Sequence, residues 1–115
     1  MSFEASCHCG AVAITVDADL PDAAMSCDCS HCRRKGFLLA FFPAAKVTVT
    51  GEDALTDYLF NKHRITHRFC ATCGVQVFGE GNGPDGTPTN AVNLRCVPGL
   101  DLDTLTVTKV NGAAA

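Results

Sequence analysis

Seven of the eight cysteines of this 115-residue chain fall into three short motifs, and this clustering constrains the fold more than any other feature. The motifs are CHCG at residues 7–10, CDCSHC at 27–32 and CATCG at 70–74. Zinc takes four ligands at tetrahedral corners with Zn–S distances of about 2.3 Å, so its ligands usually arrive in local groups of this kind. We therefore expect metal to hold distant segments of the chain together.

Disulfide bonds are the alternative use for so many thiols. The N-terminal sequence MSFEASCHCG lacks the basic segment and the apolar stretch of a secretory signal. We therefore expect a cytoplasmic protein, whose thiols stay reduced. A Cys-x-Cys pair also cannot easily close on itself, because the Cβ geometry of a disulfide is hard to reach across one residue. Both points favour metal ligands.

The first and last motifs are cysteine pairs followed directly by glycine. Glycine allows a positive φ, which lets a turn aim its backbone N–H groups at the sulfurs. Two such pairs complete a four-cysteine site, which we interpret as structural. Its predicted ligands are Cys7, Cys9, Cys70 and Cys73.

The middle motif places three thiols within one short loop, and these are Cys27, Cys29 and Cys32. Three protein ligands with an open fourth position distinguish catalytic zinc from structural zinc. We therefore predict two zinc ions per chain, the second in a catalytic three-cysteine site. Two alternatives stay open: a histidine (His31, His63 or His67) closes the site, or the cysteines pair differently, because spacing does not fix connectivity.

Three cations, Arg33, Arg34 and Lys35, follow the middle motif directly. They can keep neighbouring sulfurs deprotonated by offsetting thiolate charge. They can also bind the carboxylates of a substrate, and we favour Arg33 and Arg34 for this role. The competing interpretation is an ordinary solvated surface.

The remaining candidate residues receive plainer interpretations. His8 and His31 lie between predicted ligands and are expected to point into solvent. Surface positions are the default for His63 and His67, although either could act as an acid or base near zinc. Cys96 is isolated on an apolar segment and is expected to be a small buried residue.

The rest of the sequence predicts a small all-β domain over residues 1–110, with a loose tail at 111–115. Alternating apolar residues or apolar runs indicate strands at 10–18, 37–42, 46–51, 54–60, 65–70, 74–79, 90–97 and 104–110. The run FLLAFF at 37–42 is expected to be buried on both faces. Residues 20–25 are expected to be a turn and residues 81–89 a loop, and no helix of ten or more residues is expected.

Bulk properties exclude some partners. The formal net charge of −3 and the absence of a basic stripe argue against nucleic acid. The sequence contains no apolar run of eighteen residues, so no membrane span is expected. The oligomeric state is not predicted.

Taken together, the motifs resemble the glutathione-dependent formaldehyde-activating enzyme family, which includes centromere protein V. The resemblance runs through SCHCGAVAITV, CDCSHCRRKG, KVTVTGEDALTDY, HRFCATCGVQVF and AVNLRCV. It implies small antiparallel sheets stapled by zinc, the fold called a β-tent. It also implies that the two cysteine groups match a structural and a catalytic zinc site. Asp28 and Ala5 depart from the family pattern, which often has His and Gly there.

The leading functional hypothesis is therefore a zinc-dependent carbon–sulfur lyase or its reverse. A glutathione-like thiol would add to a formaldehyde-like aldehyde and give an S-hydroxyalkyl thiol. Two alternatives remain: a non-catalytic, zinc-stapled protein-interaction module, and a metal or redox sensor with an oxidisable cysteine triplet. A pocket beside Cys27, Cys29 and Cys32 would favour the enzyme.

Overall fold

The computed structural model describes residues 1–59, 65–83 and 85–110, and the chain there forms two β-sheets and one short helix. The smaller sheet has the order β1-β2-β5, and the larger one has the order β10-β3-β4-β9-β8-β7-β6. The strands are β1 (Phe3–Ser6), β2 (Ala13–Val16), β3 (Ala23–Cys27), β4 (Leu39–Pro43), β5 (Val47–Thr50), β6 (Leu55–Tyr58), β7 (Thr66–Cys70), β8 (Gln76–Asn82), β9 (Pro88–Asn93) and β10 (Thr106–Val110). The predicted all-β class is confirmed.

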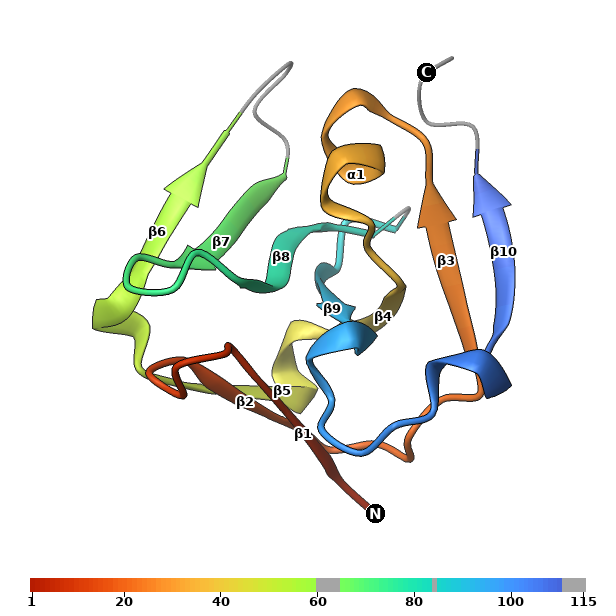
Figure 1. Cartoon of the computed structure of the whole chain (residues 1–115), viewed down its shortest axis with the longest axis horizontal. Coiled ribbons are helices and arrows are strands. Elements are labelled where there is room, and N and C mark those ends of the chain that lie inside the picture. The colour runs from red at the N-terminus through yellow and green to blue at the C-terminus, as the bar shows by residue number, and fades with distance from the viewer. Residues whose placement is uncertain (60–64, 84, 111–115) are drawn as a thin grey trace.

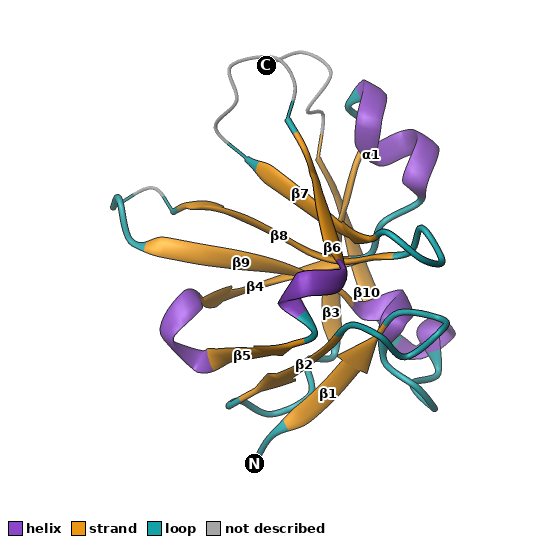
Figure 2. Ribbon diagram, turned by 90° about the vertical axis from the view of Figure 1, so that its left-hand side faces the viewer, coloured by secondary structure: helices purple, strands orange, loops and turns teal. Residues whose placement is uncertain are grey.

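The larger sheet bends strongly, so that β6 and β7 stand on one side of the molecule and β3 and β10 on the other (Figure 1). Helix α1 (Ser30–Lys35) lies between these two sides. The three-stranded sheet lies below the larger one when the molecule is turned (Figure 2). Short 3-10 turns at Ala44–Lys46, Glu52–Ala54, Leu94–Cys96 and Leu102–Thr104 connect the strands.

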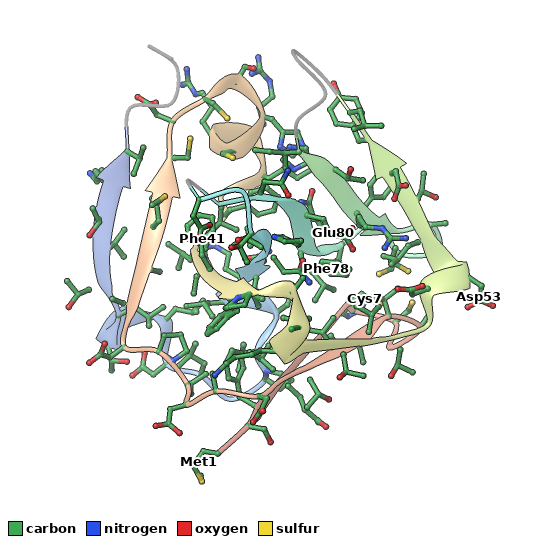
Figure 3. The ribbon with its side chains drawn as sticks, turned by 180° about the vertical axis from the view of Figure 1, so that it is seen from behind. Met1, Cys7, Phe41, Asp53, Phe78 and Glu80 are labelled. Atoms are coloured by element: carbon green, nitrogen blue, oxygen red, sulfur yellow. The ribbon has the colours of Figure 1, made fainter. Side chains whose placement is uncertain are left out.

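Both sheets contribute alternate residues to one apolar core. Val12, Ile14 and Val16, the alternating apolar residues of the strand predicted over 10–18, are all buried. From the larger sheet, Phe78 and Val92 are fully buried, and Phe78 lies near the centre of the molecule (Figure 3). The strands predicted over 65–70 and 74–79 are present as β7 and β8 and form a hairpin, with a register shift between residues 68 and 69.

Several sequence predictions need correction. Residues 23–27 form strand β3 instead of a turn, and the N-terminal strand β1 was not anticipated. The larger sheet is not wholly antiparallel, because β10 pairs parallel with β3. The strand expected over residues 90–97 ends at Asn93, where the asparagine side chain accepts a hydrogen bond from the Arg95 N–H and starts a 3-10 turn.

The apolar run at 37–42 also differs from expectation. Phe37 and Leu38 are buried but precede the strand, which begins at Leu39. Phe41 lies within β4 (Figure 3) and is 49% exposed, so this strand is not covered on both faces by the residues that the structure describes.

One ion-pair network ties three neighbouring strands together. Arg68 on β7 is largely buried and donates to Asp57 on β6 at 3.0 Å and to Glu80 on β8 at 3.1 Å. It lies on the face of the sheet that also carries Phe78, whose ring is 5.9 Å from the guanidinium. The network fixes β6 and β8 against β7 on that face.

No helix in the described part of the chain is long and apolar enough to cross a membrane.

Candidate metal centres

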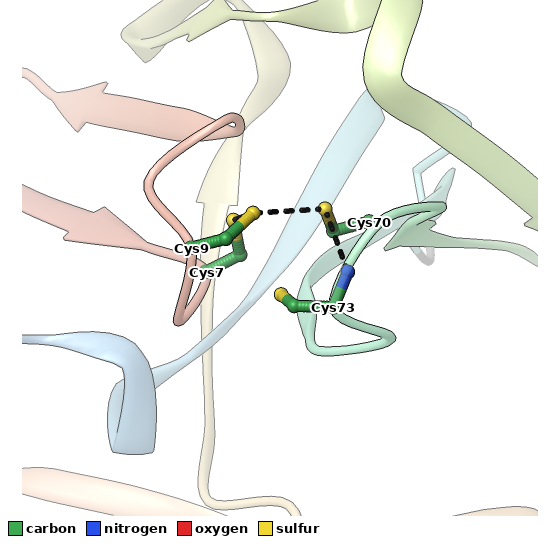
Figure 4. A group of neighbouring side chains, drawn as sticks. All are labelled: Cys7, Cys9, Cys70 and Cys73. Atoms are coloured by element: carbon green, nitrogen blue, oxygen red, sulfur yellow. Dashed lines mark hydrogen bonds between the residues drawn. The ribbon is translucent and has the colours of Figure 1, made fainter.

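Four thiols from two distant segments meet at one point (Figure 4). Cys7 and Cys9 follow β1, whereas Cys70 ends β7 and Cys73 lies in the turn after it. The Sγ atom of Cys9 lies 3.6 Å from the Sγ atom of Cys7 and 3.6 Å from that of Cys70, and all four sulfurs are within 4.8 Å of one another. Tetrahedral zinc with Zn–S bonds of about 2.3 Å requires sulfurs about 3.8 Å apart, so this cluster fits a zinc ion.

Both turns of this cluster point backbone N–H groups at sulfur. The Val12 N–H donates to the Cys7 sulfur at 3.3 Å, and the Cys73 N–H donates to the Cys70 sulfur at 3.5 Å. Gly10 and Gly74 have φ of 83° and 80°, the left-handed region that glycine adopts without steric cost. These are the positions and the reason that the sequence predicted.

Backbone N–H groups around Cys70 and Cys73 favour thiolate, the form that binds metal. Hydrogen bonds from the backbone N–H groups of Val75 and Cys9 lower the pKa of Cys73 to about 6. The Cys73 N–H likewise lowers the pKa of Cys70. At Cys9 the Ala11 N–H lowers the pKa, but the neighbouring thiols, Cys70 first, and burial outweigh it and raise the value to about 11. A bound cation would relieve that crowding of thiolates.

The three cysteines of the middle motif form the second cluster. Their sulfurs lie within 4.8 Å of one another, so these residues too could hold a metal ion. Cys27 ends β3, Cys29 is the N-cap of helix α1, and Cys32 lies inside that helix. No histidine of the described segments joins either cluster, and His63, a suggested fourth ligand, lies outside the described residues.

Helix α1 replaces the loop that the sequence predicted here. The Cys29 sulfur accepts the Cys32 N–H at 3.4 Å, and Gly36 ends the helix with φ of 71°. Burial, the largest single influence, raises the pKa of the Cys29 thiol, but hydrogen bonds from the Cys32 N–H, the Cys32 thiol and the His31 N–H together outweigh it, so the net pKa is lowered. The pKa of Cys32 is raised, chiefly by burial. Of Cys29 and Cys32, Cys29 therefore has the thiol that ionises more readily.

The expectations for His31 and His67 were wrong. His67 on β7 is only 6% exposed, and its Nδ1 lies 3.2 Å from the amide nitrogen of Gln76. The His31 ring is half-buried, with its centroid 4.1 Å from that of His67 and 5.5 Å from that of Tyr58, on which it stacks. Burial and, secondarily, the charge of Lys35 lower the pKa of His31. His8 is exposed, as predicted.

A cavity of about 400 Å³ opens beside α1. Arg34 and Lys35 line it from the helix, and the Lys35 ammonium lies 5.3 Å above the ring of Phe69. One guanidinium nitrogen of Arg34 donates to the Ser30 carbonyl at 2.8 Å. Arg33 is exposed on the same helix and is not among the residues lining this cavity. The remaining lining residues are His31, Tyr58 and Phe69.

Cys96, expected to be a small buried residue, is partly buried and packs against the core. Its thiol donates to the Gln76 carbonyl at 3.6 Å. Burial raises its pKa to about 11, so it stays a neutral thiol outside both clusters.

The buried position of His67 predicts a pH-dependent stability. Burial, together with His31 and Lys35, lowers its pKa to about 4 from an ordinary 6.5. Between these values the unfolded chain binds a proton here that the folded chain does not, so the free energy of unfolding falls as pH falls through this window. The total loss is about 3 kcal/mol.

Chemical denaturation of the zinc-loaded protein at pH 7, 5.5 and 4 measures this effect. The difference in free energy of unfolding between the native chain and His67→Gln should change by about 3 kcal/mol over that range. The pH dependence of the metal-binding thiols is common to both proteins and cancels in this difference. His8→Gln, at an exposed position, is the matched control. A difference between native chain and His67→Gln that is constant with pH would contradict a buried, neutral His67.

Comparisons with known proteins agree with the motifs. The sequence model of the family described as glutathione-dependent formaldehyde-activating enzyme matches residues 2–99. Among solved structures, the crystal structure of a Rhodobacter sphaeroides protein is similar, with 32% sequence identity and a TM-score of 0.77. The match covers 91% of this chain and 99% of that one.

Proposed function

Because the chain belongs to the family of glutathione-dependent formaldehyde-activating enzymes, we propose that it catalyses the reversible addition of a glutathione-like thiol to an aldehyde. The observation that carries this proposal is the cavity beside α1, the helix that also carries Cys29 and Cys32. A non-catalytic module or a sensor would not need a cationic cavity there.

The reaction needs no oxidant or reductant. The thiol sulfur forms a bond to the carbonyl carbon, the π bond of the carbonyl breaks, and the thiol proton ends on the oxygen. The product is an S-hydroxyalkyl thiol, and the reverse direction cleaves its carbon–sulfur bond. Zinc at an open three-cysteine site would supply Lewis acidity and lower the pKa of a coordinated thiol. Cys27, Cys29 and Cys32 would hold it there.

The residues of the cavity would bind and orient the thiol. The Arg34 guanidinium and the Lys35 ammonium would hold its carboxylates, and Tyr58 and Phe69 would cover its apolar part. His31 stays neutral at pH 7, because burial lowers its pKa, so the positive charge of this cavity comes from Arg34 and Lys35.

The proposal predicts that the double substitution Arg34→Gln/Lys35→Gln raises the KM for the thiol about tenfold, since a charge-assisted hydrogen bond contributes roughly 1.5–3 kcal/mol. Zinc content should not change, and added salt should reproduce part of the effect in the native protein. Steady-state kinetics with elemental analysis of the same samples measures both quantities.

Arg33→Gln is the matched control, because it removes one charge from the same helix at a position that does not line the cavity. It should leave the KM within about twofold, as expected for exposed charges. Equal effects of Arg33→Gln and Arg34→Gln would show that only the net charge of the helix matters. An unchanged KM in the double variant would exclude carboxylate binding at Arg34 and Lys35.

A further inference from the structure

A second cavity, of about 430 Å³, lies on the same face of the larger sheet as His67. Its volume is within the usual range for small-molecule sites, about 300–1,000 Å³. The apolar part of its lining is Met25, Phe41, Ile65, Ala91 and the glycines 79, 81 and 83. We refer to this cavity as the apolar trough.

The strand register explains why the sheet is hollowed here. Phe41 pairs with Ala91, Ala91 with Gly79, and Gly79 with His67, so these four residues form one row across β4, β9, β8 and β7. Directly opposed residues lie on the same face of an antiparallel sheet. Two small residues therefore lie between a phenylalanine and a histidine, and they form a depression about two strand spacings wide.

Three polar residues, Glu80, Asn82 and Thr89, also line the trough, and the Thr89 hydroxyl donates to the Thr87 carbonyl at 3.0 Å. Glu80 alternates with Gly79 and Gly81 along β8, so its carboxylate points to the opposite face, where Arg68 binds it at 3.1 Å. Meanwhile Phe41 and Ile65 expose 49% and 51% of their surfaces. Large apolar side chains that are exposed to solvent around a depression indicate a binding site for an apolar ligand.

The trough adjoins the proposed reaction centre. A Cβ placed on Gly79 would lie 3.8 Å from the Nδ1 atom of His67, whose ring contacts that of His31 beside the three-cysteine cluster. On the other side, Met25 lines the trough and lies two residues before Cys27 on β3, on the same face of that strand. The cationic cavity is thus lined by His31, whereas Gly79 of the trough lies beside His67, the other member of the histidine pair.

We propose that the apolar trough binds the unbranched hydrocarbon chain of the aldehyde substrate, so that the preferred carbonyl compound is a short aliphatic aldehyde. This inference rests on the proposed function. It assigns the two cavities to the two reactants: the charged thiol binds beside α1, and the chain of the aldehyde lies over Gly79 and Ala91.

The test compares kcat/KM for propanal and hexanal with a fixed thiol, because the reactivity of the carbonyl is nearly constant over this series. The three added methylene groups should raise kcat/KM about tenfold in the native protein, less than full burial of each would give. Ala91→Leu fills the trough and should bring the hexanal-to-propanal ratio close to one.

Two further variants serve as controls for misfolding of Ala91→Leu and for the added leucine side chain. Phe41→Ser changes a half-exposed wall residue, so it should fold even if Ala91→Leu does not, and it should lower the same ratio about threefold. Ala45→Leu adds the same side chain on the exposed turn after β4 and should leave the ratio unchanged. A hexanal-to-propanal ratio of kcat/KM near one in the native protein would overturn the assignment. A ratio in Ala91→Leu as high as that of the native protein would also overturn it.

Binding of n-hexanol, which has the chain but no carbonyl, separates the inference from the proposed function. It should shift the backbone amide NMR signals of Gly79, Gly81 and Ala91. If n-hexanol shifts these signals but no aldehyde is turned over, both the proposed function and the assignment of the trough to an aldehyde chain are contradicted. Only an apolar binding site is then supported. If these signals do not move, or if light scattering finds a dimer that Phe41→Ser dissociates, the trough is not a small-molecule site.

Discussion

Cys70→Ser should leave the chain largely unfolded. Cys70 is completely buried and belongs to the cluster that joins residues 7–9 to residues 70–73. A metal there closes a loop of about sixty residues and ties the smaller sheet to the hairpin of the larger one. Structural zinc contributes on the order of 10 kcal/mol to folding, which is comparable with the whole stability of a small domain.

Circular dichroism, thermal melting and zinc analysis of purified Cys70→Ser measure this effect. Cys96→Ser is the matched control, because Cys96 is a partly buried thiol outside both clusters. It should cost about 1 kcal/mol and keep all of the zinc. A soluble Cys70→Ser protein with native melting behaviour and zinc content would remove the structural role of this cluster.

Cys29→Ser should have the second large effect, and on activity instead of folding. The three-cysteine cluster spans only residues 27–32, so a metal there constrains little chain. Its loss should therefore cost little folding free energy. Serine is also one of the preferred N-cap residues, so helix α1 should still start at this position. We expect a folded protein with about one fewer zinc ion per chain and no measurable thiol–aldehyde activity.

Zinc content, melting temperature and turnover of Cys29→Ser should be measured on one preparation. Full zinc content would show that the triplet is not a metal site. Normal activity with reduced zinc would place the chemistry elsewhere. If the native chain itself bound a single zinc ion, the interaction module would become the better interpretation.

The cysteine clusters were predictable because their signal is local. Two cysteines followed by a glycine indicate a metal-binding turn from a few adjacent residues alone. Tetrahedral coordination then leaves few ways to combine two such pairs. Strands with strict alternation, such as that around Ile14, were predictable for the same reason.

The residues around the second cluster were harder to predict, because their environment is set by tertiary contacts. His67 alternates with its neighbours on β7 and resembles a surface histidine, yet α1 packs His31 against it. Helix α1 itself is six residues long and is capped by a cysteine, which is not among the usual N-cap residues. The apolar trough depends on the register of four strands, and single-strand patterns do not contain that information.

The measurement that tests the central claim most directly is the exchange rate between free glutathione and its S-hydroxymethyl adduct, followed by NMR with formaldehyde and zinc-loaded protein. The uncatalysed addition also proceeds, so the protein must be compared with buffer alone. We predict an exchange rate that rises in proportion to the concentration of native protein and returns to the buffer value with Cys29→Ser. An exchange rate equal to that in buffer, with formaldehyde and also with hexanal, from native protein shown to carry two zinc ions per chain, would contradict the proposed enzyme.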